Sequence, residues 1–228
     1  MGASIALAES GADVTLVSRT EQELKEICDH INSQGLSASY VALDVNNENE
    51  INHLIEKSNP FDILINNAGT NKPAKLVDTD INDFDYVMSL NVRSVVNLTK
   101  CVVKKMLAND MKGSIINVSS QMGHVGGPNR TTYCSSKFAI EGFTKSLAIE
   151  LAPNGIRVNT VCPTFIQTPM TEPFLKDEEF KKNTIGMIPL GRLGEVRDLM
   201  GPFVFLASEA SSLMTGSSLL VDGGWTSR

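Results

Sequence analysis

Short apolar runs alternate with longer amphipathic runs along the whole chain, and no linker, repeat or low-complexity tract separates them. The runs with strand character are 12–17, 39–43, 61–66, 114–119, 156–161 and 218–221. Those with helical character are 3–10, 21–34, 49–57, 84–107, 133–151 and 197–206. Alternation of helices with nearly continuous apolar strands indicates a parallel sheet covered on both faces. We therefore predict an α/β fold, a doubly wound parallel sheet, as a single domain over 1–228.

Composition narrows the function class. The 228 residues carry 20 Lys and Arg against 26 Asp and Glu, a net charge of −6 without a basic run, which argues against nucleic acid as a partner. No apolar stretch approaches the roughly 18 residues of a membrane span, and no signal peptide is visible, so we expect no membrane partner and a cytoplasmic protein. The histidines and cysteines lack the spacing of a metal site or a disulfide framework, so no metal is expected: His30, His53, His124, Cys28, Cys101, Cys134 and Cys162.

Tyr133 and Lys137 lie four residues apart at the head of a helical run. That spacing places the phenol and the ammonium on one face of a helix. A nearby cation favours the phenolate, because it stabilises the charged form of a group whose reference pKa is about 10. Ser120 follows a predicted strand, at the end where open α/β sheets place ligands. The three residues together indicate a proton-transfer site.

Six elements occur in an order and at intervals that characterise one family: 66–69 (Asn-Asn-Ala-Gly), Asn91, Ser120, the Tyr133/Lys137 pair, 157–163 (Arg-Val-Asn-x-Val-x-Pro) and 221–224 (Val-Asp-Gly-Gly). In these the chain resembles the classical short-chain dehydrogenase/reductase family, and is similar to 3-oxoacyl-carrier reductases, gluconate 5-dehydrogenases and other sugar dehydrogenases. The resemblance implies a Rossmann-like fold. It also implies an oxidoreductase that transfers hydride between NAD(P)(H) and a carbonyl or secondary alcohol, assembled as a homodimer or homotetramer.

The resemblance assigns catalytic roles to four residues. Tyr133 would be the acid and base, and Ser120 would hold the substrate oxygen. Lys137 would lower the pKa of Tyr133 and bind the nicotinamide ribose. Asn91 would kink its helix and hold a water that replenishes protons; a buried asparagine satisfied by backbone is the competing interpretation.

The cofactor preference is expected after the strand 12–17. An acidic residue there takes the ribose hydroxyls of NAD, whereas an arginine accommodates the 2′-phosphate of NADP. Ser18 and Arg19 therefore favour NADP(H), with NAD(H) possible and a solvated, functionless Arg19 as the alternative. The other cofactor contacts that the resemblance implies are Gly2, Asp44, Val45, Asn67, Ala68, Gly69, Tyr133, Lys137, Pro163, Ile166 and Thr168. For Asp44, helix capping is the alternative.

The substrate is less defined. Arg130 lies one turn before Tyr133 and is a candidate for holding a substrate carboxylate or phosphate, next to Ser120 and Tyr133; a surface arginine is the alternative. The segment 170–194 is long, of mixed polarity and rich in charge, which is typical of a lid that closes over substrate. An ordinary surface helix would have the same composition. The residues leave 3-oxoacyl thioesters and sugar acids open as substrates.

Family members begin with a strand and a glycine-rich turn that have no counterpart here, and Gly2 matches the last glycine of that turn. The strand is central in the doubly wound order, so we expect two ladders without a partner at that place. A chain start internal to a longer natural chain is the favoured explanation. The alternative is a cofactor-deficient remnant that acts as a binding or oligomer-partner protein.

Overall fold

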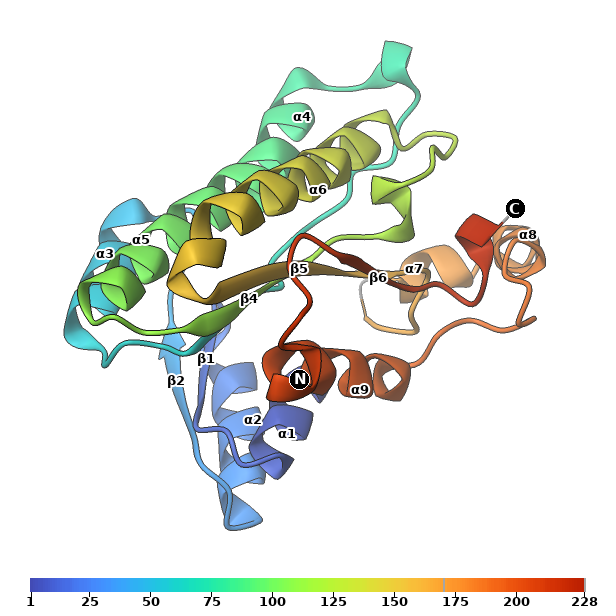
Figure 1. Cartoon of the computed structure of the whole chain (residues 1–228). Helices are drawn as coiled ribbons and strands as arrows, with labels where there is room; N and C mark the ends of the chain where they lie inside the picture. Colours follow the sequence, from blue (N-terminus) through green and yellow to red (C-terminus); the bar gives the residue numbers. More distant parts are fainter. Residues whose placement is uncertain (170, 228) are drawn as a thin grey trace.

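The computed structural model describes residues 1–169 and 171–227, and its parallel strands lie between two layers of helices (Figure 1). The strands are β1 (Val14–Ser18), β2 (Ala38–Ala42), β3 (Ile63–Asn66), β4 (Gly113–Val118), β5 (Ile156–Pro163) and β6 (Ser218–Val221). The helices are α1 (Gly2–Glu9), α2 (Glu21–Ser33), α3 (Glu48–Lys57), α4 (Ile81–Met88), α5 (Ser94–Ala108), α6 (Thr131–Leu151), α7 (Glu172–Leu175), α8 (Glu178–Gly186) and α9 (Val196–Ala207). The predicted α/β fold with parallel strands is confirmed.

Apolar side chains from both layers meet the strands. On one face, α3, α5 and α6 pack on β4 and β5 through a cluster that includes Ile51, Met106, Ile115 and Ile156, each fully buried. On the other face, α9 packs on the same strands through Leu206 and its neighbours, and α2 covers β1 and β2. Figure 1 shows these two layers. Burial of both faces explains why the strands have no regular polar alternation.

The strands form two separate ladders, β2–β1 and β3–β4–β5–β6, and among the described residues no pairing joins β1 to β3. The Val14 N–H donates to the Ser37 carbonyl at 3.1 Å, on the β2 side of β1. Backbone N–H and C=O groups point alternately to the two sides of a strand, so the other groups of β1 point toward the side where β1 has no partner strand. Likewise, the Ser114 N–H donates to the Asp62 backbone carbonyl at 2.9 Å, on the β4 side of β3. Residues of β1 and β3 are mostly half-buried, whereas those of β4 and β5 are mostly buried. The expected interruption of the sheet is confirmed, between β1 and β3.

Sequence periodicity gave one long helix over 84–107, and the structure corrects it. The helical segment begins at Ile81, because the Asp80 side chain caps it by accepting a hydrogen bond from the Asn82 N–H at 2.9 Å. A wider π turn over Ser89–Arg93 then separates α4 from α5. Periodicity is insensitive to both features, because a cap precedes the apolar face and a π turn adds one residue without changing composition.

Buried amides connect the strands that end at the site to the helices beside them. Asn66 of β3 donates to the Thr99 hydroxyl of α5 at 2.9 Å and to the Asn117 side-chain oxygen of β4 at 2.8 Å. Asn117 in turn donates to the Thr144 hydroxyl of α6 at 2.8 Å. A satisfied buried polar network fixes one arrangement of its members, because each lost partner leaves an uncompensated group. The network therefore sets how α5 and α6 sit on β3 and β4.

The four cysteines are all free thiols. Within the described part of the chain, no helix combines the length and the apolar character that a membrane crossing requires.

Candidate active site

The helix α6 and the end of β4 bring Tyr133, Lys137 and Ser120 together. Before α6 the chain turns through Asn129, whose φ of 58° is a left-handed conformation that asparagine tolerates. One helical turn after Tyr133, the Lys137 Nζ lies 5.6 Å from the centre of the Tyr133 ring. Ser120 is close enough to Tyr133 to act on the pKa of its phenol. The three residues predicted as a proton-transfer site are therefore neighbours.

Lys137 is buried, with 5% of its surface exposed, and its Nζ donates to the Val118 carbonyl at 2.8 Å. Burial lowers the pKa of Lys137 from 10.5 to about 8, and the fields of Cys162 and Glu141 act in the opposite direction. With a pKa near 8, the ammonium keeps most of its charge at pH 7 and loses it as the pH rises through that value.

Burial raises the pKa of Tyr133, while the nearby Ser120 opposes that effect and Arg130 opposes it less strongly. The expectation that Lys137 lowers the pKa of Tyr133 is therefore not met in this structure. The physical reason is the balance of two effects: removal of the phenol from water disfavours the phenolate, and the Lys137 ammonium forms its hydrogen bond with Val118. A raised pKa keeps the phenol protonated, the form that donates a proton.

Ser120 follows β4 and caps a short 3₁₀ turn, Gln121–Gly123, by accepting a hydrogen bond from the Met122 N–H at 3.1 Å. Its hydroxyl donates to the Gln121 side-chain oxygen at 2.7 Å. The hydroxyl is thus fixed at the carboxyl end of β4. To donate to a substrate oxygen, it must turn away from Gln121.

Asn91 lies in the π turn between α4 and α5, where the resemblance implies a kink. Its side-chain oxygen accepts from the Thr70 N–H at 2.8 Å, and its amide donates to the Thr70 carbonyl at 2.9 Å and the Ser136 hydroxyl at 3.0 Å. These are the bonds of a buried asparagine satisfied by its surroundings. They tie the loop after β3 to α6, and the role in proton replenishment stays a prediction.

Most of the expected cofactor residues lie at or just after the carboxyl ends of β1, β2, β3 and β5, whereas Gly2 lies on α1 and Tyr133 and Lys137 lie on α6. After β1, the exposed Arg19 has no ion pair with any described residue, so its guanidinium is available to a phosphate. The Ser18 carbonyl accepts a hydrogen bond from the Leu43 N–H at 2.9 Å. After β3, Asn67 and Ala68 are exposed.

Gly69 is a place of close approach. A Cβ there would lie 3.3 Å from the Asn91 side-chain oxygen and 3.8 Å from the Lys137 Nζ, so a side chain would enter the space next to Lys137. After β5, the buried Thr164 hydroxyl oxygen has no hydrogen-bond partner among the described residues. A free guanidinium, a side-chain-free approach to Lys137 and an unpaired buried hydroxyl fit a nucleotide cofactor along these strand ends.

Three other residues that are expected to contact the cofactor, Asp44, Val45 and Gly2, also have structural roles. The Asp44 carboxylate accepts from the Asn46 N–H at 2.9 Å in a local turn, and Val45 packs on the core. Asn47 caps α3, so the alternative that Asp44 is the cap of this helix is wrong. A Cβ on Gly2 would overlap Val196, so this glycine permits the packing of α1 on α9.

At the end of β5, the Pro163 backbone pairs with β6. Beyond it, Ile166 is buried and forms a bridge with Gly194, and the Thr168 hydroxyl lies 3.2 Å from that of Thr171. This geometry keeps the loop after β5 close to the following turn.

Arg130 is not a surface residue, because only 7% of it is exposed. Its guanidinium lies 5.8 Å from the centre of the Phe174 ring in α7 and donates to the Asn129 carbonyl at 3.3 Å. No described carboxylate pairs with it. Burial lowers the pKa of Arg130. A buried guanidinium without an acidic partner, beside Tyr133, is suited to an anionic ligand.

The expected lid, 170–194, begins at Met170, which lies outside the described residues. The remainder contains α7 and α8, and it packs on the loop after β5 through Phe165, whose ring centre lies 5.7 Å from that of Phe180. Phe165 is also 5.9 Å from Trp225 near the C-terminus. An aromatic cluster therefore holds this segment next to Arg130.

Three further residues meet behind Lys137, and sequence spacing did not predict them. The side chains of His124, Glu141 and Cys162 lie within 3.6 Å of one another in pairs. One signal was available for Glu141, which follows Lys137 by four residues and so shares its face of α6.

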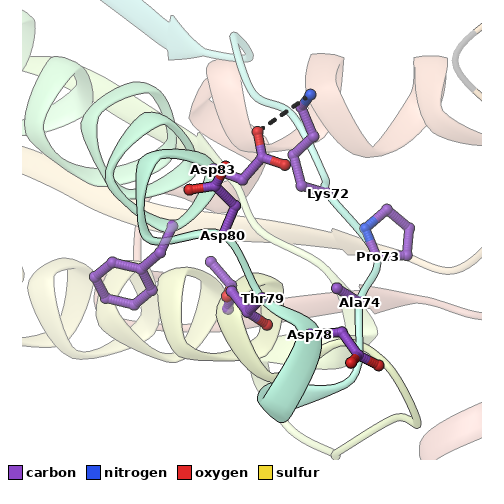
Figure 2. A pocket seen from close by; sticks show the side chains of 9 residues that line it. Lys72, Pro73, Ala74, Asp78, Thr79, Asp80 and Asp83 are labelled. Atoms are coloured by element: carbon purple, nitrogen blue, oxygen red, sulfur yellow. Dashed lines mark ion pairs between the residues drawn. The ribbon is translucent and has the colours of Figure 1, made fainter.

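Figure 2 shows a depression at the start of α4, lined by Lys72, Pro73, Ala74, Asp78, Thr79, Asp80, Asp83, Phe84 and Thr132. Lys72 and Asp83 form an ion pair across it at 3.3 Å. Thr132 adjoins Tyr133 in sequence, but none of Ser120, Tyr133 or Lys137 lines the depression. The catalytic candidates thus lie outside it.

Comparison with known proteins identifies the family. A family model described as enoyl-(acyl carrier protein) reductase matches residues 1–226. A cyclopentanol dehydrogenase of Comamonas testosteroni is 39% identical over 96% of this chain and 89% of its own, and a 3-oxoacyl-[acyl-carrier-protein] reductase of Thermotoga maritima is 36% identical over 97% and 90%. The structure of a gluconate 5-dehydrogenase from Burkholderia cenocepacia in complex with NADP and tartrate has a TM-score of 0.95 at 30% identity, over 100% of this chain and 90% of that one. With this fold and this arrangement of Ser120, Tyr133 and Lys137, the chain belongs to the classical short-chain dehydrogenase/reductase family of NAD(P)-dependent oxidoreductases.

Proposed function

We propose that this chain interconverts a secondary alcohol and a carbonyl group with NADP(H), and that its substrate is a hydroxy acid or oxo acid of the sugar-acid type. The family match carries the reaction class. The buried Arg130, which has no ion-pair partner among the described residues, supports the choice of an acid as the substrate.

When bound, the cofactor supplies or accepts the hydride. In the reduction direction, Tyr133 donates its proton to the substrate oxygen, and its raised pKa holds that proton until the alkoxide develops. The Ser120 hydroxyl positions the same oxygen. Lys137 would hold the ribose hydroxyls of the bound cofactor, and Gly69 leaves the space beside its Nζ free of a side chain. Asn91 holds the loop after β3 against α6, which keeps these groups in register.

NADP(H) is favoured over NAD(H) by Arg19, whose free guanidinium follows β1. The related gluconate 5-dehydrogenase from Burkholderia cenocepacia was solved with NADP, and so was a 2-deoxy-D-gluconate 3-dehydrogenase-like protein from Agrobacterium tumefaciens, which is 34% identical. The remaining contacts would come from the loops after β2, β3 and β5.

Arg130 supports the proposed substrate class. A buried guanidinium without a carboxylate partner is costly, and a substrate carboxylate would form a bidentate pair with it. The segment with α7 and α8 contacts Arg130 through Phe174, so we infer that it closes over the bound acid. The tartrate in the Burkholderia cenocepacia structure is a dicarboxylic hydroxy acid, which supports this choice.

The test compares gluconate and related sugar acids with their neutral alcohols, using NADP⁺ reduction and the fluorescence of Trp225, the sole tryptophan, to follow closure. We expect kcat/KM to favour the acids, and Arg130→Met to lower it for acids by about 10- to 100-fold, as for a lost charge-assisted hydrogen bond. Arg197→Met, at an exposed arginine paired with Glu195, is the matched control.

Equal kcat/KM for acids and neutral alcohols would refute the substrate class and leave the reaction class intact. Absence of turnover with any alcohol or carbonyl, in a chain that also fails to bind NADPH, would instead favour the cofactor-deficient binding protein. The presence of Ser120, Tyr133 and Lys137 in catalytic proximity argues against that alternative.

We also infer that the chain forms a homodimer or homotetramer through the outer faces of α5 and α6. Large apolar side chains are exposed there, including Phe138 at 49% and Ile149 at 78%. We expect Ile149→Lys to reduce the mass measured by analytical ultracentrifugation. Leu213→Lys, at an apolar residue that is 99% exposed outside these helices, should leave the mass unchanged. A monomeric parent chain would contradict the inference.

The four free thiols support a reducing compartment, and we propose the cytoplasm. Cell fractionation tests this, and recovery in a secreted fraction would refute it.

A further inference from the structure

A compact group of three potential metal ligands lies behind the catalytic lysine. His124 follows the 3₁₀ turn after β4, Glu141 lies on α6 and Cys162 lies on β5. The His124 Nε2 is 3.6 Å from the Glu141 Oε1 and 3.5 Å from the Cys162 Sγ. The Cys162 Sγ is 3.3 Å from the same Glu141 oxygen. Three different ligand types thus converge from three elements of the fold.

These distances can be compared with those of a zinc site. Typical bonds of about 2.0–2.1 Å to nitrogen, 2.3 Å to sulfur and 2.0–2.2 Å to oxygen place tetrahedral ligand atoms about 3.3–3.6 Å apart. The three observed separations, 3.6, 3.5 and 3.3 Å, span the same range. The side chains therefore already define one face of a tetrahedron. Without an ion, the same separations suit hydrogen bonds of the Cys162 thiol with Glu141 and His124.

The surroundings of Glu141 hold its carboxylate in place. Its Oε2 accepts from the Ser218 hydroxyl at 2.6 Å and from the Thr160 hydroxyl at 3.2 Å, which leaves Oε1 directed to His124 and Cys162. A Cβ on Gly123 would lie 3.1 Å from the Glu141 side chain, so the turn packs closely on it. Such outer contacts orient ligands in metal sites.

One ligand is accessible from solvent. The His124 side chain is 27% exposed, whereas that of Glu141 is 7% exposed. An ion can therefore reach the group from the His124 side and keep a water as its fourth ligand. Two of the three side chains stay shielded.

We propose that His124, Glu141 and Cys162 bind one divalent transition-metal ion, zinc in particular. Imidazole and thiolate ligands select such ions over Mg²⁺ and Ca²⁺, which prefer oxygen. On binding, the Cys162 S–H bond breaks, the thiolate donates an electron pair to the ion and the proton leaves to solvent. No oxidation state changes. The site is distinct from the groups that touch substrate, although Glu141 is one helical turn from Lys137.

The experiment uses tag-free protein titrated with CoCl₂ and, in competition, with ZnCl₂. We expect one Co²⁺ per chain, a thiolate-to-cobalt charge-transfer band with the visible spectrum of a tetrahedral ion, and loss of both on addition of one equivalent of Zn²⁺. Cys162→Ser should abolish the band. Loss of a residue that only supports a metal ligand typically weakens metal binding by about 10- to 100-fold. His124→Gln and Glu141→Gln should each weaken Co²⁺ binding by more than this.

Cys101→Ser and His53→Gln are the matched controls, because they remove the same ligand types from residues outside the group, and both should bind as the parent does. The proposal is overturned if the parent chain shows no charge-transfer band, a result that does not depend on the folding of any variant. It is also overturned if the band persists in Cys162→Ser, because another thiolate would then be the ligand.

Discussion

Replacing Tyr133 by phenylalanine is expected to lower kcat by at least about 10²- to 10⁴-fold, the usual contribution of a general acid or base. The substitution removes one oxygen atom, the atom that we propose as the proton donor, and leaves the ring. Lys137 keeps its hydrogen bond to the Val118 carbonyl, so the cofactor side of the site is preserved. NADPH affinity, measured by fluorescence titration, should therefore change little while turnover, measured by NADPH absorbance, is lost.

Tyr86→Phe is the matched control. Tyr86 lies on α4 and is 38% exposed, so loss of its hydroxyl should leave both the rate and the affinity unchanged. A near-normal rate in Tyr133→Phe would contradict the assignment of Tyr133 as the acid. If NADPH affinity fell together with the rate, the phenol would have a binding role that the structure does not indicate.

Most of the fold could be predicted because its information is local. Apolar runs and their periods gave every strand to within about three residues, since a buried parallel strand needs a continuous apolar segment. The interruption between β1 and β3 was also predictable, because the order of strands in such sheets fixes which neighbours lose a partner. The π turn over Ser89–Arg93 was implied only by the family resemblance.

The site was predictable where it depends on helical spacing. Tyr133 and Lys137 share a face because they are four residues apart. The pKa of Tyr133 could not be read in this way, since its direction depends on how much water the fold removes from the phenol. The burial of Arg130 could not be predicted from the sequence either, because the residue that covers it, Phe174, lies 44 positions further along the chain.

The group formed by His124, Glu141 and Cys162 illustrates the same limit. Its members come from a turn, a helix and a strand, and their sequence separations follow no metal-binding pattern. The parallel order of β4 and β5 brings them together, as does the packing of α6 on β5. Their proximity, within hydrogen-bonding distance, can therefore be recognised only in the tertiary structure.

Arg19→Ala is expected to weaken NADPH binding by about 10- to 150-fold, which corresponds to the about 1.5–3 kcal/mol of a hydrogen bond to a charged group. The guanidinium follows β1, is exposed and has no ion pair among the described residues, so its charge is free for the 2′-phosphate. NADH lacks that phosphate, and its affinity should stay within about twofold of the parent, since no charged contact is lost. Both dissociation constants can be measured by the fluorescence of the bound nicotinamide.

A second variant, Arg19→Asp, tests the same contact with the opposite charge. The carboxylate repels the 2′-phosphate and can accept hydrogen bonds from the ribose hydroxyls of NADH, so the ratio of kcat/KM for NADPH to that for NADH should fall further than in Arg19→Ala. Arg93→Ala is the control, at an exposed arginine that pairs with Glu48 far from β1 in sequence. If Arg19→Ala weakened NADPH and NADH equally, Arg19 would contact a part that both nucleotides share, such as the adenine, and the preference for NADP(H) would need another residue.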